Sequence, residues 1–230
     1  RWLWDLQESD WAALPGGTFA KPKETFARTD EAQALLDPEE DGVCEWAAHS
    51  PDVARALGFK VEIPAERILQ RLRVARLKEH PLTTQRAAAY YEHLSRDEQS
   101  STIVQKAFQE GLIYVPSRSC NWWRPEECLR REHSSIFGDL CGYLGAYGSA
   151  DRLWERLGIN SDPDLDYLSR FWLRVSNSKE LKGRDLVRGL SATYILAERL
   201  IDGLGLVGKT VPVLADGEWH NSSEVFVTEH

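Results

Sequence analysis

The chain has 230 residues, a formal net charge of −8, 42% hydrophobic and 28% charged residues. This ordinary globular composition excludes disorder over most of the chain, and the length suits one large domain or two smaller ones. A net negative charge argues against wholesale wrapping of nucleic acid or of an anionic membrane, which need a basic surface, but it leaves room for a local basic patch.

Neither end nor interior carries a membrane or export signal. The apolar runs are shorter than the ~18–20 residues of a membrane span, and the segment Arg1-Trp2-Leu3-Trp4 is no signal peptide. The cysteines fit reduced thiols better than a disulfide framework. We therefore expect a cytoplasmic protein with no membrane partner. Because the sequence lacks methionine, we also expect it to be a piece of a longer polypeptide.

The predicted elements give mixed structure with helix in excess. Helices are predicted over about residues 4–12, 51–57, 64–79, 84–95, 97–109, 150–157, 163–175 and 184–203. Strands are predicted near 18–20, 112–116, 210–214 and 224–228, with Asp216-Gly217 as a hairpin turn. The first helix carries Trp2, Trp4 and Trp11, a pattern typical of packing against a core or a neighbour. The fold class is a helix-rich α+β fold.

A block of turn residues recurs along the chain at intervals of about 100 residues. In each copy an apolar residue and a proline precede a polar turn and then a glutamate two residues before an apolar one. The dipeptides are Leu14-Pro15, Val115-Pro116 and Val211-Pro212, and the glutamates are Glu24, Glu127 and Glu224.

The intervening helices recur at the same interval. Residues 50–59 and 149–159 each combine a serine N-cap signal with a Leu-Gly stop, and a further helix begins at Pro64 and at Pro163. We predict two tandem units, 1–110 and 111–208, each a short β-hairpin or small sheet followed by helices. Residues 209–230 would be a β-hairpin that opens a third unit. The alternative is a single α+β domain with recurring turn chemistry.

The segments 211–226 and 157–175 resemble repeat regions of sacsin-like and NO VEIN-like proteins. The resemblance implies that an Hsp90-like (GHKL) ATPase lies elsewhere in a longer polypeptide, and that bacterial relatives belong to defence or restriction systems. The ATPase's own Asp-x-Gly-x-Gly block is absent from this sequence. Gly203-Leu-Gly-Leu-Val-Gly208 lies after a predicted helix and before a strand, which is the reverse of a dinucleotide site.

Two basic clusters are candidates for nucleic-acid binding. Arg67, Arg71 and Lys78 lie on one face of a predicted helix, where they would neutralise phosphates. The second cluster interleaves arginines with aromatic rings that suit base stacking: Arg118, Trp122, Trp123, Arg124, Arg130 and Arg131. A solvated charged face, with the tryptophans in the core, is the simpler interpretation of both clusters.

The sequence gives weaker signals for metal binding and catalysis than for these basic clusters. Cys120, Cys128, His133 and Cys141 lack the tight C-x2–4-C knuckle of a structural zinc site, so we predict no metal and no cofactor. Residues 39–41 are interpreted as a solvated acidic loop, and catalytic motifs are absent.

These patterns favour a non-catalytic repeat module that scaffolds or recognises a partner. The alternatives are a nucleic-acid-binding module of a bacterial defence or restriction protein, and an enzyme with a dispersed active site.

Overall fold

The computed structural model describes residues 2–47, 50–78, 82–116, 121–133, 137–164, 166–168, 170–171, 174, 212–215 and 218–221. Helices alternate with small two-stranded sheets, which confirms the predicted α+β class. The predicted helix 184–203 and strand 224–228 lie outside these residues. The chain divides into two compact units, residues 1–114 with 147–156, and residues 115–146 with 157–230, and each is described by itself.

The first unit holds most of the described helices. Its elements in chain order are α1 (Trp2–Glu8), β1 (Ala12–Leu14), β2 (Thr18–Ala20), the one-turn 3₁₀ helix η1 (Pro22–Glu24), β3 (Phe26–Arg28), α2 (Asp30–Leu35), α3 (Pro38–Asp41), β4 (Val43–Ala47), α4 (Pro51–Ala56), α5 (Ala65–Leu77), α6 (Thr84–Arg96), α7 (Ser101–Phe108), β5 (Ile113–Tyr114) and α9 (Asp151–Arg156).

A small parallel sheet forms the N-terminal part of this unit. η1 leads into β3, which runs parallel to β4 with Phe26 opposite Val43. Lys60 extends the sheet on the other side, because the Ala27 amide donates to its carbonyl at 2.9 Å and its own amide donates to Thr25 at 2.9 Å. β1 and β2 form an antiparallel hairpin, and β1 contacts β4.

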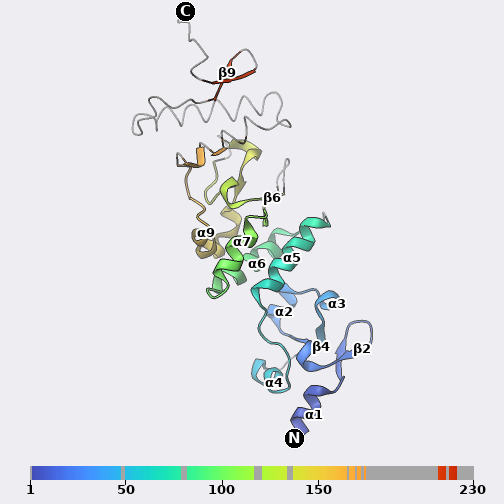
Figure 1. Cartoon of the computed structure of the whole chain (residues 1–230). Helices are drawn as coiled ribbons and strands as arrows, with labels where there is room; N and C mark the ends of the chain where they lie inside the picture. Colours follow the sequence, from blue (N-terminus) through green and yellow to red (C-terminus); the bar gives the residue numbers. More distant parts are fainter. Residues whose placement is uncertain are drawn as a thin grey trace, which may run out of the picture. The chain divides into compact units, whose positions relative to one another are not determined.

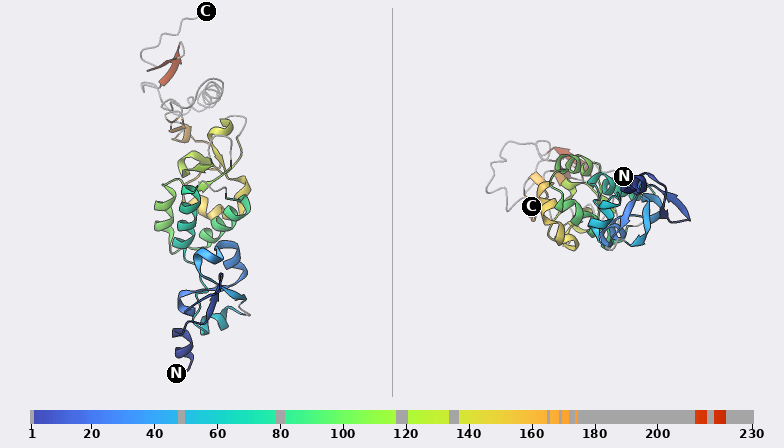
Figure 2. Two further views of the ribbon diagram at one scale, coloured as in Figure 1. Left: turned by 90° about the vertical axis from the view of Figure 1, so that its right-hand side faces the viewer. Right: turned by 90° about the horizontal axis from the view of Figure 1, so that it is seen from below.

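Helices α5, α6 and α7 form a layer, coloured teal to green in Figures 1 and 2, that encloses the core of the unit. Leu72, Tyr91 and Phe108 are fully buried there, and the rings of Tyr91 and Phe108 lie 6.1 Å apart. α6 also contacts α2 and α9. Burial of apolar surface between these helices is the main source of stability in the unit.

The predicted helices α4, α5, α6 and α9 are confirmed within two residues at each end. Two helices are shorter than predicted. α7 begins at Ser101 because the Asp97 carboxylate accepts hydrogen bonds from the amides of Gln99 and Ser100, at 3.0 and 3.2 Å, and holds a turn there. α1 ends at Glu8, and the Ser9 hydroxyl then donates to a carbonyl within the helix.

Several short elements escaped the sequence analysis. Thr29 caps α2 by accepting a hydrogen bond from the Ala32 amide at 3.0 Å, and α3 is a single turn. Strands β1 and β3 have three residues each, which is too short for an alternating pattern to be visible in the sequence.

The second unit repeats the combination of a 3₁₀ turn and a parallel strand pair. Its described elements are β6 (Trp122–Trp123), η2 (Pro125–Glu127), β7 (Cys128–Leu129), η3 (Gly138–Leu140), β8 (Gly142–Tyr143), β9 (Pro212–Ala215) and β10 (Glu218–Asn221). The 3₁₀ segment η4 (Gly145–Ala150) runs from this unit into the first.

Strands β7 and β8 are parallel, with Leu129 opposite Tyr143, and the Arg130 amide donates to the Asn160 carbonyl at 3.0 Å. Strands β9 and β10 are antiparallel with Ala215 opposite Glu218, which confirms the predicted hairpin. Within the described part of the chain, every helix is too short or too polar to cross a membrane.

Candidate functional site

A charged cluster in the first unit is the strongest candidate site, and it forms around the buried carboxylate of Asp41. The single turn α3 places this residue. Asp37 caps its start by accepting from the amides of Glu39 and Glu40, Pro38 fills the first helical position, and Gly42 ends the turn in the left-handed region at φ 67°. This turn directs Asp41 inward, and its side chain is only 1% exposed.

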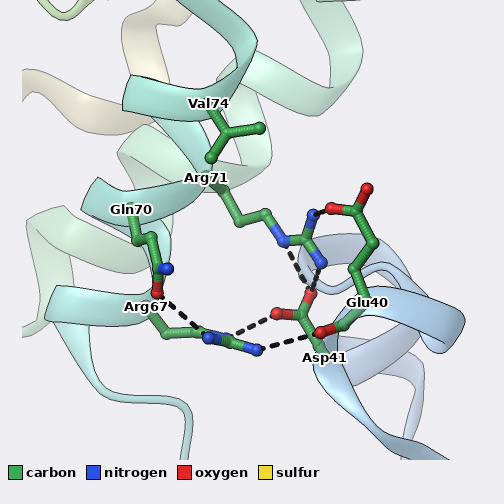
Figure 3. Close-up of a pocket in the computed structure, with 6 residues that line it drawn as sticks. All are labelled: Glu40, Asp41, Arg67, Gln70, Arg71 and Val74. Atoms are coloured by element: carbon green, nitrogen blue, oxygen red, sulfur yellow. Dashed lines mark hydrogen bonds and ion pairs between the residues drawn. The ribbon is translucent and has the colours of Figure 1, made fainter.

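Two arginines of α5 converge on this carboxylate (Figure 3). Arg67 and Arg71 are four residues apart and therefore share a helix face. Arg71 donates from Nε to Asp41 Oδ2 at 2.7 Å, and its other nitrogens contact Asp41 and Glu40. Arg67 Nε lies 2.5 Å from Asp41 Oδ1. Lys78 Nζ reaches Glu40 Oε1 at 3.2 Å.

The two arginine contacts differ in quality. Arg71 forms directed hydrogen bonds, whereas Arg67 Nε and Asp41 Oδ1 are close but misaligned, so their contact is an ion pair without a well-directed hydrogen bond. Asp41 Oδ2 additionally accepts from the Asp37 amide at 2.7 Å. A buried carboxylate held by two guanidinium groups is stable only as a set, because removal of one partner leaves a desolvated charge.

Two groups of this cluster, Glu40 and Arg71, have pKa values that are shifted in favour of their charged forms. Hydrogen bonds from Lys78 and then Arg71 hold the pKa of Glu40 below its usual range. Burial acts to lower the pKa of Arg71, but the hydrogen bonds and charges of Asp41 and Glu40 outweigh it, so this pKa lies above its ordinary value. A general acid or base needs a pKa near the working pH, and these two groups are shifted away from neutrality.

A surface pocket of about 310 Å³ adjoins the cluster. Its lining mixes charged and apolar side chains: Asp37, Glu40, Arg71, Val74, Ala75, Lys78, Leu82, Thr83, Arg86 and Tyr90. Arg86 donates to the Tyr90 hydroxyl at 3.0 Å and to the Leu36 carbonyl at 3.0 Å. All three cations of the pocket thus already have acceptors within the protein, and an anionic ligand would have to displace them.

The second unit has a neutral cluster at positions exactly 100 residues further along. Phe137, Cys141, Tyr167 and Phe171 follow Asp37, Asp41, Arg67 and Arg71 at an interval of 100 residues in the sequence. Tyr167 donates its hydroxyl to Cys141 Sγ at 3.0 Å, as Arg71 donates to Asp41. The Phe137 ring packs on the rings of Tyr167 and Phe171, at 5.7 and 4.8 Å between centroids.

The two described thiols of the second unit, Cys128 and Cys141, are buried and unreactive. Burial raises the pKa of Cys141 to about 11 and that of Cys128 well above its ordinary value. A thiol kept protonated is a poor nucleophile and a poor metal ligand. Cys120, the first member of the predicted cysteine–histidine series, lies outside the described residues. Among the residues that are described, no group of three or more His, Cys, Asp or Glu side chains is placed to hold a metal ion.

The second predicted nucleic-acid segment does not form one open surface. Trp123 is 5% exposed, and its indole donates to the Val115 carbonyl at 3.2 Å, so its ring is closed to a base. Trp122 and Arg130 are half-buried, while Arg124 is exposed. Arg131 pairs with Asp162 at 3.2 Å. Arg118 lies outside the described residues.

The structure brings together Arg67, Arg71 and Lys78, as the helical spacing predicted, but it adds the acidic partners that the sequence analysis missed. The interpretation of residues 39–41 as a solvated loop was wrong for Asp41, which is buried. The available signal was the run Asp37-Pro-Glu-Glu-Asp-Gly42, with a cap residue, a first-turn proline and a terminal glycine.

His93 likewise has partners that its sequence neighbourhood did not indicate. Its Nδ1 lies 3.0 Å from Glu31 Oε1 on α2, and its Nε2 lies 2.8 Å from the Ile63 carbonyl. His133 lies 3.2 Å from Asp162 Oδ1. Each arrangement ties together segments 29 or more residues apart, which is a structural role.

Comparison with known proteins found no matching family model, no matching curated protein and no matching solved structure.

Proposed function

We propose that this chain is a non-catalytic module of tandem α+β units, part of a larger ATPase-headed polypeptide, which scaffolds that protein or recognises a partner. The observation that carries the proposal is the pair of equivalent clusters. One position in the fold is filled by charges in the first unit and by neutral aromatic and thiol groups in the second. Side chains that are charged in one copy and neutral in the other cannot catalyse the same reaction. Such a position therefore serves packing and the character of the surface.

The turn before the small sheet supports the tandem arrangement. In η1 the Thr25 amide donates to the Pro22 carbonyl, and in η2 the Cys128 amide donates to the Pro125 carbonyl. The turn ends on Glu24 in the first unit and on Glu127 in the second, and a parallel strand follows each time.

The strand pairing after each turn agrees as well. Phe26 pairs with Val43, and Leu129, 103 residues after Phe26, pairs with Tyr143, 100 residues after Val43. The third segment of each sheet agrees, because the Ala27 amide donates to Lys60 and the Arg130 amide donates to Asn160. The difference of three residues falls in the connection between the paired strands. Connections tolerate such insertions.

A helix of six residues precedes the third segment in both copies, although the helix of the second copy, α9, belongs to the first compact unit. α4 and α9 begin exactly 100 residues apart, and each is followed by a Leu-Gly pair. Gly58 and Gly158 both have positive φ, at 92° and 71°, which ends the helix in the left-handed region. These agreements involve backbone hydrogen bonds and register, which recurring turn residues alone do not produce.

The sequence resemblance to sacsin-like and NO VEIN-like repeat regions implies the same role. In such an arrangement the ATPase lies elsewhere, and the units provide rigid spacing and surfaces. The charged cluster of the first unit then distinguishes its surface from that of the second.

Nucleic-acid binding is less well supported. Phosphate contacts need cations that are free to exchange counterions. Arg67, Arg71, Lys78 and Arg131 each lie within hydrogen-bond or ion-pair distance of a carboxylate. Binding would therefore require breaking those pairs, two of which hold the buried Asp41.

The proposal is tested by assaying the purified chain for ATP turnover and for nuclease activity with added magnesium. We expect neither above a heat-denatured control. A mobility-shift titration with single- and double-stranded DNA and RNA, at two salt concentrations, tests the alternative. Robust turnover, or micromolar binding that weakens with salt and is lost in the Lys78→Gln, Arg131→Gln variant, would contradict the proposal.

A further inference from the structure

His93 of α6 joins three segments of the first unit at one point. Its Nδ1 lies 3.0 Å from Oε1 of Glu31, in the first turn of α2, and its Nε2 lies 2.8 Å from the carbonyl oxygen of Ile63, just before α5. The side chain of His93 is only 15% exposed, whereas that of Glu31 is 48% exposed. The ring is thus held between a partly solvated carboxylate and a backbone carbonyl.

Both of these partners are hydrogen-bond acceptors. A carbonyl oxygen and an ionised carboxylate can only accept, so each contact needs an N–H on the ring nitrogen that faces it. A neutral imidazole has one N–H and a lone pair on its other nitrogen, whereas the imidazolium ring has two N–H groups. The charged form of His93 therefore satisfies both contacts, and the neutral form satisfies one.

The contact that depends on the second proton is the one to Glu31. Ile63 is 5% exposed, so an unpaired carbonyl would be costly there, whereas the half-exposed carboxylate of Glu31 can bind water instead. The neutral ring therefore keeps its proton on Nε2, and the lone pair of Nδ1 then faces a negative charge. This repulsion acts to separate α2 from α6.

The other charged side chains around the ring come from α6, from the turn after it and from the segment before α5: Glu92, Arg96, Asp97 and Glu62. Arg96 pairs with Glu92 four residues earlier, and the exposed Glu62 lies 3.9 Å from Arg55. Asp97 is close enough to His93 for their opposite charges to attract. These groups leave Glu31 as the direct partner of Nδ1, and Asp97 also favours a charged ring.

Solvent reaches this point of contact. A surface groove of about 350 Å³ runs between α2 and α6, and its lining includes Glu31, Ala34 and Leu35 of α2 and Ala89 and His93 of α6. A proton can therefore enter or leave the ring without unfolding of the unit.

We propose that His93 is a proton-dependent clasp, which fastens α2 to α6 while its ring is charged and releases α2 when the ring loses a proton. Histidine is the side chain whose charge ordinarily changes near neutral pH. Because the folded contacts select the protonated ring, their stabilisation is complete at acidic pH and is lost as the pH rises. This pH response goes beyond the proposed scaffolding function and does not depend on the tandem arrangement.

Hydrogen exchange with mass spectrometry tests the clasp in the full chain. Exchange of the α2 amides is measured at about pH 6 and about pH 8 and divided at each pH by the rate of an unstructured peptide, which gives protection factors. We expect the protection of α2 to be about fivefold lower at the higher pH, because α2 opens locally. The amides of α7 serve as the internal reference and should change by less than about twofold. Equal protection of α2 at both pH values would overturn the proposal.

Two variants of α2 distinguish the clasp from a general effect of charge. In Glu31→Gln the side-chain amide can donate to the neutral Nδ1, so the protection of α2 should no longer depend on pH. Asp30→Asn removes the same charge from the neighbouring exposed position and should keep the pH dependence of the parent chain. If Glu31→Gln kept that dependence, or if Asp30→Asn abolished it equally, the proposal would be overturned.

Nitrogen NMR of the imidazole ring reads the protonation state directly. We expect the ring of His93 to keep both protons to a higher pH in the parent chain than in Glu31→Gln, because the carboxylate stabilises the second N–H. Loss of the proton at the same pH in both proteins would show that Glu31 does not hold it, which would also overturn the proposal.

Discussion

The charged cluster of the first unit and the neutral cluster of the second occupy corresponding positions and use opposite chemistry. Asp41 is held by Arg67 and Arg71, whereas Cys141 accepts one hydrogen bond from Tyr167 among aromatic rings. Both central side chains are buried. The comparison teaches that the backbone at this position tolerates either a compensated charge or no charge.

The charged version has an energetic disadvantage that needs a reason. Buried ion pairs often contribute no more stability than well-packed apolar groups of similar size, yet they are costly to break. The first unit also has a pocket beside its cluster, lined in part by Asp37 and Arg71, whereas residues 137 and 171 of the second unit are phenylalanines whose rings lie 4.8 Å apart. The charges therefore specify a surface, not the fold.

The largest effect is expected where a carboxylate enters the neutral cluster, because the cation beside this cluster, Arg174, is already paired with Glu127 at 3.0 Å. Cys141→Asp would bury a carboxylate among Phe137, Tyr167 and Phe171, at a cost of about 4 kcal/mol or more. Urea unfolding followed by the signal of the second unit measures it. Cys141→Ser is the control for size and should cost much less. A small loss in Cys141→Asp would mean that water or a cation reaches this position.

The second-largest effect is expected when the central carboxylate of the first unit is replaced by the thiol of the second. Asp41→Cys leaves two guanidinium groups without their shared carboxylate and should cost about 3–5 kcal/mol. The triple variant Asp41→Cys, Arg67→Tyr, Arg71→Phe installs the side chains of the second unit and should recover most of that loss. Urea unfolding midpoints give both values, with Glu40→Gln as a surface control. A triple variant no more stable than the single one would show that the two positions are not equivalent.

Gly42 and Gly142 sharpen the comparison, because they correspond in position but are required for different reasons. Gly142→Ala would place a Cβ 2.9 Å from Cys128 Sγ and 3.0 Å from the Trp123 ring, an overpacking cost of about 1–3 kcal/mol. Gly42→Ala meets no neighbouring atom but must adopt φ 67°, at about 1–2 kcal/mol.

A second substitution distinguishes these two costs in the same unfolding assay. Cys128→Ala should partly rescue Gly142→Ala by opening space. Gly42→Asn should cost less than Gly42→Ala, since asparagine tolerates the left-handed region. If truncating a neighbouring side chain restored the stability of Gly42→Ala as well as that of Gly142→Ala, the backbone explanation for Gly42 would be refuted.

The smallest expected effect is on the stability of the first unit at acidic pH. Hydrogen bonds from the Glu40 amide, and then from that of Glu39, keep the pKa of Asp37 below its usual range. The stability that the ionised Asp37 contributes is fully present above its pKa in the unfolded chain, and it is lost as the pH falls through the lower pKa of the folded protein. Because Asp37 is half-exposed, we expect this contribution to the free energy of unfolding to be below about 1 kcal/mol.

Asp37→Asn keeps the helix cap but cannot titrate, so it should flatten the stability of the first unit between about pH 5 and 3. Thermal unfolding across that range measures it. The corresponding residue of the second unit, Phe137, has no titratable group. We therefore expect residue 137 to contribute no such pH dependence to the stability of that unit. A steeper acid loss in Asp37→Asn would reverse the assigned sign.

Local signals in the sequence located the helices that have both a cap and a stop. Ser50 with Gly58 bounds α4, and Pro64 immediately precedes α5. The recurrence of turn residues at intervals of about 100 also came from the sequence alone. Strands of two or three residues were not predicted, since their pairing is determined by partners far along the chain.

What the sequence by itself determined is therefore the helix content, the α+β class and the basic face of α5, because these depend on neighbours within a few residues. The tertiary structure alone decided that Asp41 is buried between Arg67 and Arg71 and that Trp123 is closed to ligands. The ion pairs of Asp41 with Arg67 and Arg71 join segments 26 and 30 residues apart, and no local pattern encodes which segments meet.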